Sequence, residues 1–113
     1  MDKLIGVGRS LWNFSILGEA VILDDDCVLP VAECANKIII THIPSPDIVI
    51  YMQNAIAIIA ETGGVLCHAA VLALEMGCPI IVGAEGIKKM IKTGDTIWAT
   101  ANSGEGKIYE RTL

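Results

Sequence analysis

Three short runs of apolar residues, rich in isoleucine, constrain the fold of this chain more than any other feature of its sequence. They span Lys37 to Thr41, Ala55 to Ala60 and Ile80 to Val82. Each run has the length and β-branched composition of a strand, and none has a polar face, so we expect three buried strands. Two further runs, Thr96 to Ala101 and Lys107 to Glu110, predict a closing hairpin.

Helix signals lie between the strand runs. Residues 45–47 read Ser-Pro-Asp, a capping hydroxyl followed by proline and an acid, which is typical of a helix start. A second helix is predicted from His68 to Met76, because Gly77 can cap its end, and a brief third helix covers Ile87 to Ile91. With a strand at Glu19 to Leu23, this alternation predicts an α/β fold, a sandwich of mixed strand direction with short helices. We expect all 113 residues to form one domain.

Composition and charge narrow the class of partner. Hydrophobic residues make up 53% of the chain, which excludes a disordered protein, and the net charge is −5. An acidic chain without a basic stripe is a poor ligand for nucleic acid or an anionic membrane. The longest uncharged runs have thirteen residues, whereas a membrane-spanning helix needs about twenty. No secretory signal is visible, so we expect a cytoplasmic protein with free, buried thiols at Cys27, Cys34, Cys67 and Cys78.

One ionisable residue, His68, stands at the predicted start of the second helix. The preceding Thr62-Gly63-Gly64 segment leaves a buried strand, so His68 lies at a carboxyl edge, where α/β sheets commonly bind ligands. Glycines there allow a backbone or a phosphate to approach closely. The free N–H groups of the first helical turn favour an anion and the neutral, nucleophilic form of the ring. Together these features favour a histidine that accepts a phosphoryl group, although spacing by itself leaves open a histidine packed in the core.

The sequence around His68 resembles the signature of the phosphohistidine swivelling domain. This is the mobile domain of the phosphoenolpyruvate-utilising enzymes, such as phosphoenolpyruvate synthase, pyruvate phosphate dikinase and rifampin phosphotransferase. The resemblance covers nearly the whole chain, since residues 6–18 look like the glycine-punctuated N-terminal turn of the family and residues 93–95 like its Gly-Asp turn. The matching central residues are Gly63 to Ala70, Ala73, Glu75, Gly77, Pro79, Val82 and Gly83.

The resemblance implies a compact, swivelling β/β/α sandwich and a carrier mechanism. His68 matches the histidine that takes a phosphoryl group from an ATP-grasp nucleotide-binding domain and passes it to an acceptor such as pyruvate or another small molecule. Gly63 and Gly64 match the glycine pair beside the phosphate. Cys67 could help to hold the phosphate or could be a small buried filler. The chain itself would bind no cofactor or metal. ATP and Mg²⁺ are expected on a partner subunit, with the acceptor site on another domain or subunit, and the chain would be a free-standing subunit, inactive alone.

Several positions depart from the family pattern. Leu74 stands where many members have arginine, and Leu66 stands where the dikinases have a regulatory threonine. Ala60 and Thr62 replace more polar or basic residues of the approach strand. None of these changes alters His68. They leave open a second hypothesis, in which the chain is a non-catalytic interaction or regulatory module with a vestigial histidine.

Other polar candidates are predicted to be structural. His42 follows a buried strand and has no acidic or thiol partner nearby in the sequence, so it is predicted to be a turn residue. Asp24 to Asp26 predict a solvated acidic turn, and Cys67 with His68 lacks the ligand spacing of a zinc site. Trp12 and Trp98 are predicted to be core or interface aromatics.

Overall fold

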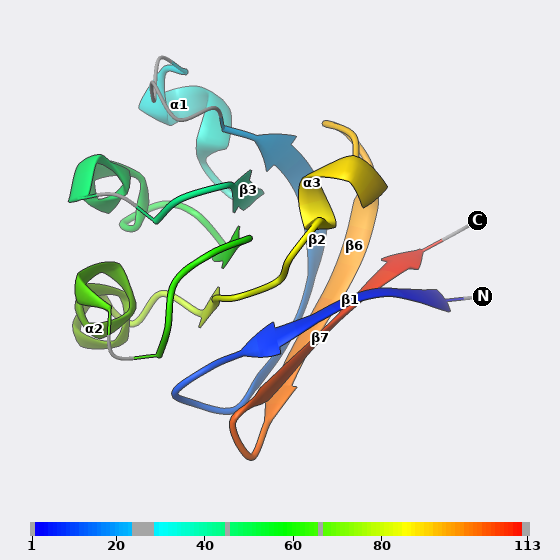
Figure 1. Cartoon of the computed structure of the whole chain (residues 1–113). Helices are drawn as coiled ribbons and strands as arrows, with labels where there is room; N and C mark the ends of the chain where they lie inside the picture. Colours follow the sequence, from blue (N-terminus) through cyan, green and yellow to red (C-terminus); the bar gives the residue numbers. More distant parts are fainter. Residues whose placement is uncertain (1, 24–28, 45, 66, 112–113) are drawn as a thin grey trace.

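The chain folds into three layers, described by a computed structural model for residues 2–23, 29–44, 46–65 and 67–111. Short helices cover one side of a group of parallel strands, and antiparallel strands cover the other side (Figure 1). The fold is therefore the small α/β sandwich that the sequence predicts. In chain order the elements are β1 (Asp2–Arg9), β2 (Phe14–Ile22), α1 (Val31–Cys34), β3 (Ile38–Thr41), η1 (Pro46–Tyr51), β4 (Ala57–Ala60), α2 (His68–Met76), β5 (Ile80–Ile81), α3 (Ile87–Met90), β6 (Thr96–Asn102) and β7 (Glu105–Arg111).

All seven strands belong to one sheet, in the order β1-β7-β6-β2-β3-β4-β5. Neighbours are antiparallel from β1 to β2 and parallel from β2 to β5. Strand β2 belongs to both parts, because residues 14–19 pair with β6 and residues 20–22 pair with β3. A bridge between Arg9 and Val82 joins the far ends, so the two parts of the sheet close over a shared core.

The isoleucines of the parallel strands alternate between two hydrophobic cores. Ile39 and Ile58 lie in the core beneath α2 and η1, whereas Ile38 and Ile59 lie in the core that faces the antiparallel strands. Successive residues of a strand point to opposite sides, so a strand buried on both sides has no polar face. The prediction of three buried strands is confirmed in β3, β4 and β5.

The N-terminal strands are the main difference from the sequence-based expectation. The sequence predicts a strand only at Glu19 to Leu23, after a glycine-punctuated turn, whereas β1 and β2 cover most of residues 2–22. The glycines of this layer face inward. A Cβ at Gly18 would lie 2.8 Å from Ile56 Cδ1, and one at Gly106 would lie 2.9 Å from the Ile81 side chain. Glycine therefore marks close packing between layers here, not the end of a strand.

The helices largely follow their sequence signals. Helix α2 has the predicted bounds, and Gly77 caps it in the left-handed conformation with a φ of 72°. The helix predicted after residue 45 is the 3₁₀ helix η1, while Ser45 itself and the predicted turn at residues 24–26 lie outside the described residues. Helix α1 is not predicted by the sequence. Within the described part of the chain, no helix has the length and hydropathy to cross a membrane.

Candidate functional site

The site lies at the carboxyl ends of the parallel strands. Because β3, β4 and β5 run in the same direction, the segments that follow them meet at one edge of the sheet. The Glu61 N–H donates to the Thr41 carbonyl at 3.0 Å, and the Gly83 N–H donates to the Thr62 carbonyl at 3.4 Å. The loop between β4 and α2 is thus tied to the ends of both neighbouring strands.

Gly63 and Gly64 play different structural parts in this loop. Gly63 has a φ of 100°, and a Cβ there would lie 3.1 Å from Pro44 Cγ and 3.5 Å from Cys67 Sγ. Gly64 has no such constraint, since a Cβ at its position would meet nothing within 4 Å. Gly63 is therefore needed for the turn, whereas Gly64 leaves open space beside it.

His68 is the first residue of α2 and is exposed to solvent. No hydrogen bond or ion pair joins its ring to any residue that the structure describes. Cys67 is the N-cap residue but provides no side-chain hydrogen bond to the helix, so first-turn N–H groups lack the usual side-chain cap. The start of α2 thus carries an imidazole ring that has no partner among the described residues, together with backbone N–H groups that have no side-chain cap.

The cysteines differ in their surroundings. Cys67 is free and half-buried, and its N–H donates to the Gly64 carbonyl at 3.0 Å. Cys34 and Cys78 are free and buried, as the sequence predicts, and Cys27 lies outside the described residues. Burial raises the pKa of the Cys78 thiol to about 11, and burial together with the charge of Glu33 raises the pKa of Cys34. Of the three thiols that the structure describes, only Cys67 has both solvent access and a place beside His68.

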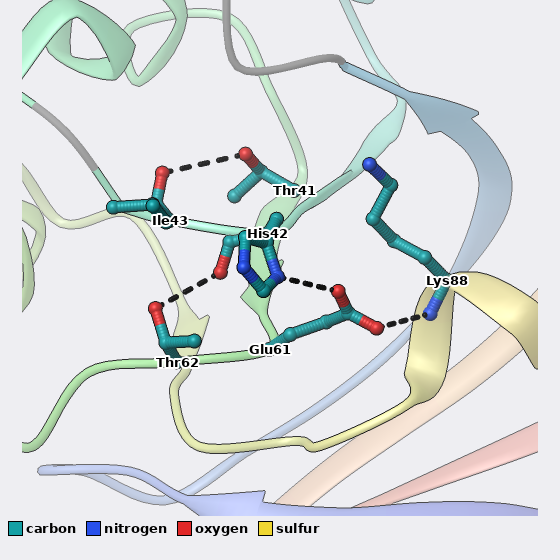
Figure 2. A network of polar contacts seen from close by, with 6 residues as sticks. All are labelled: Thr41, His42, Ile43, Glu61, Thr62 and Lys88. Atoms are coloured by element: carbon teal, nitrogen blue, oxygen red, sulfur yellow. Dashed lines mark hydrogen bonds and ion pairs between the residues drawn. The ribbon is translucent and has the colours of Figure 1, made fainter.

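A polar network next to the glycine loop joins three segments that are distant in sequence (Figure 2). The Glu61 carboxylate contacts His42 Nδ1 at 2.8 Å and accepts the Lys88 backbone N–H at 3.0 Å. Burial alone would raise the pKa of Glu61, but these hydrogen bonds and the charges of His42 and Lys88 outweigh it and lower that pKa. Glu61 is thus ionised at neutral pH, and the proton of a neutral His42 ring lies on Nδ1.

The main chain of His42 anchors the same loop. Its carbonyl accepts both the Thr62 N–H and the Thr62 hydroxyl, each at 3.0 Å (Figure 2). His42 is a turn residue as predicted, and no acid lies near it in the sequence, but the fold brings it an acidic partner, Glu61, from 19 residues away. The topology places both residues directly after neighbouring parallel strands, and the strand signals could have revealed this.

Arg9 is a second residue that the sequence does not single out. It lies at the end of β1, where its backbone pairs with Val82 through hydrogen bonds of 2.8 and 2.9 Å. Arg9 and residues of the glycine loop line one surface hollow, and Glu105 is the acidic residue of its lining. The residues that line the hollow are Val7, Gly8, Arg9, Gly63, Gly64, Gly83 and Glu105.

Comparison with known proteins identifies this arrangement. Residues 34–104 match the family described as PEP-utilising enzyme, mobile domain, and the matched range contains both glycines, Cys67 and His68. The chain belongs to this family. It is therefore a mobile domain of the type associated with phosphotransfer.

Relatives of this mobile domain are much longer proteins. A pyruvate kinase of Staphylococcus epidermidis is 33% identical over 105 residues, which are 93% of this chain and 17% of the relative. A probable phosphoenolpyruvate synthase of Pyrococcus abyssi is 37% identical over 106 residues, 94% of this chain and 11% of the relative. The mobile domain thus spans about a sixth or less of the length of these proteins.

A solved structure supports the fold. The solution NMR structure of a UPF0107 protein superimposes with a TM-score of 0.61 and covers 94% of this mobile domain and 97% of its own chain. The sequence identity is 16%, so the likeness concerns the fold alone.

Across the described ranges, no group of three or more His, Cys, Asp or Glu side chains is placed to hold a metal ion.

Proposed function

We propose that this mobile domain is the phosphocarrier component of a multi-subunit phosphotransferase. His68 accepts a phosphoryl group from an ATP-grasp subunit, which holds ATP and Mg²⁺, and passes it to pyruvate or another small acceptor. The observation that supports this proposal is the exposed ring of His68 at the first residue of α2, directly after the glycine loop. A carrier needs a nucleophile that two different active sites can reach, and a solvent-exposed ring at a helix end meets that need.

The transfer is a pair of substitutions at phosphorus. The lone pair of the unprotonated His68 nitrogen attacks the phosphorus, an N–P bond forms, and the P–O bond to the nucleotide breaks with its electron pair on the leaving oxygen. The N–H groups at the start of α2 favour the added negative charge. The open space at Gly64 admits the phosphoryl oxygens. At the second site an acceptor oxygen attacks, the N–P bond breaks, and the nitrogen regains its lone pair.

The donor subunit must cover the surface around His68, because a bond can form only when the ring reaches the bound nucleotide. Val71 and Leu74 on α2 are both exposed and lie about one and two turns beyond the histidine. Leucine at position 74 offers an apolar contact in place of the arginine common in the family. We expect the donor subunit to present an apolar patch to this face of α2.

The test is phosphorylation by the ATP-grasp protein of the same organism, with ATP and Mg²⁺. We expect an acid-labile, base-stable phosphate on the wild-type chain, none on His68→Ala, and an undiminished yield on His42→Ala as the matched control. A signal that persists in His68→Ala would refute the carrier proposal. No signal, with a donor protein that phosphorylates another mobile domain, would support the non-catalytic docking module instead.

A further inference from the structure

The outward face of the antiparallel strands carries a row of large apolar side chains, of which Leu4 and Leu17 are exposed and Trp98 and Tyr109 are partly exposed. Directly paired residues of neighbouring strands share one side of a sheet. Leu4 pairs with Tyr109, Tyr109 with Trp98, and Trp98 with Leu17, so the row crosses β1, β7, β6 and β2 in turn. Leu4 is 50% exposed and Leu17 is 47% exposed. We call this set of four residues the apolar row.

The two aromatic side chains of the apolar row are held in place. The rings of Trp98 and Tyr109 stack with centroids 4.8 Å apart and an interplanar angle of 27°. The indole Nε1–H of Trp98 donates to Ser15 Oγ at 2.9 Å, which fixes the ring against the sheet. Rigid aromatic side chains of this kind are enriched at the centres of protein–protein interfaces, since little conformational entropy is lost when a partner covers them.

The charges around the apolar row indicate what covers it. The acids on this face are Asp2, Glu19 and Glu105, and the bases are Arg9, Lys107 and Arg111. Asp2 Oδ1 lies 3.6 Å from Arg111 Nε, and Glu105 Oε1 lies 3.6 Å from Lys107 Nζ. Glu19 forms an ion pair with Lys37 of the neighbouring segment.

This face is therefore balanced in charge, although the whole chain has a net charge of −5. A nucleic acid or an anionic membrane requires an excess of bases, and a strongly basic partner requires an excess of acids. A second copy of the same face meets it without net repulsion.

We propose that two copies of this chain associate through the antiparallel faces, with the apolar row at the centre of the contact. Strands about 4.8 Å apart, with about 3.3 Å per residue, give the four-stranded face an extent of roughly 19 by 23 Å. Such an area is small compared with the roughly 800 Å² per partner of a stable complex. A contact of this size is typical of a weak, reversible dimer.

The proposed dimer leaves the phosphocarrier site open. The apolar row lies on the antiparallel layer, whereas α2 lies on the opposite, helical layer (Figure 1). His68 stays exposed when two antiparallel faces meet, so the dimer does not depend on the proposed function. Each dimer would present two carrier histidines on its two outer sides.

The test is sedimentation velocity of the full chain between about 1 µM and about 1 mM, with Leu17→Lys and Leu4→Lys as disrupting variants. The matched control is Leu74→Lys, because Leu74 is 45% exposed but lies on α2. We expect a concentration-dependent dimer in the wild type and the control, and at least a tenfold (~1.4 kcal/mol) weaker dimer in both row variants. Acrylamide quenching of wild-type tryptophan fluorescence should fall as the protein concentration rises, which tests the proposal even if a variant fails to fold.

Three results would overturn the proposal. The first is a chain that stays monomeric, with unchanged tryptophan quenching, at every protein concentration tested. A chain whose antiparallel face binds only a different protein would give this result. The second is a dimer that folded Leu17→Lys and Leu4→Lys leave intact. The third is a dimer that Leu74→Lys dissociates as strongly as the row variants do.

Discussion

Replacement of Gly63 by alanine tests whether the glycine pair has one role or two. Gly63 has a φ of 100°, and its alanine Cβ would lie 3.1 Å from Pro44 Cγ. Gly77 also has a positive φ, of 72°, but its Cβ position is open. Gly64 has an open Cβ position and no positive φ in the left-handed range. Alanine at Gly77 therefore tests backbone strain alone, and alanine at Gly63 tests backbone strain together with steric contact. Alanine at Gly64 tests a role in phosphate binding without either effect.

The expected losses of stability follow from these geometries. A residue with a Cβ in a left-handed backbone costs about 1–2 kcal/mol, so Gly77→Ala should lower the free energy of unfolding by about 1 kcal/mol. Gly63 lies beyond the usual left-handed range, and Pro44 must also move, so Gly63→Ala should lower it by about 2–3 kcal/mol. Gly64→Ala should change it by less than about 0.5 kcal/mol. At about 4–8 °C per kcal/mol for a small domain, Gly63→Ala should melt roughly 8–24 °C below the wild type.

The assay combines urea unfolding of the three variants with the phosphorylation test. We expect Gly64→Ala to fold normally but to accept phosphate more slowly, because a methyl group enters the space beside the phosphoryl oxygens. The reasoning is refuted if Gly63→Ala is as stable as Gly77→Ala, which would mean that the Pro44 contact has no effect. A loss of stability in Gly64→Ala equal to that in Gly63→Ala would refute it equally.

Three further predictions concern the same edge of the sheet. Glu61→Gln should lower the free energy of unfolding by about 1–2 kcal/mol at neutral pH. Because the pKa of Glu61 is lowered in the folded protein, this stabilisation is present above its ordinary pKa of 4.5 and is lost as the pH falls through the folded pKa. The urea midpoints of wild type and variant should therefore converge in acid. Cys67 should react with a maleimide at least about a hundredfold faster than buried Cys78, whose pKa is about 11; equal rates in the native protein, followed by mass spectrometry, would contradict the described burial. Leu74→Glu should leave the urea midpoint unchanged but slow phosphorylation of His68 by the donor subunit about tenfold, and an unchanged rate would place the docking surface elsewhere.

Much of the fold could be predicted because its signals are local. The C-terminal end of α2 follows from Gly77, which adopts the left-handed cap without strain, and the strands β3, β4 and β5 follow from runs without a polar face. Strand β1 could not be predicted in this way. The glycines of β1 are explained by their close packing against distant side chains, since Ile87 Cδ1 would lie 2.6 Å from a Cβ at Gly6.

For the candidate site, the sequence by itself predicted the proposed nucleophile and its loop, because His68 and the glycines adjoin along the chain and share one helix start. Only the tertiary structure decided that the ring faces solvent, that Glu61 meets His42, that Arg9 borders the glycine loop, and that four apolar side chains line up across separate strands. These features join residues that are far apart in sequence, and their contacts depend on strand order and register. Local propensities do not encode either of these, since both arise from the packing of the whole chain.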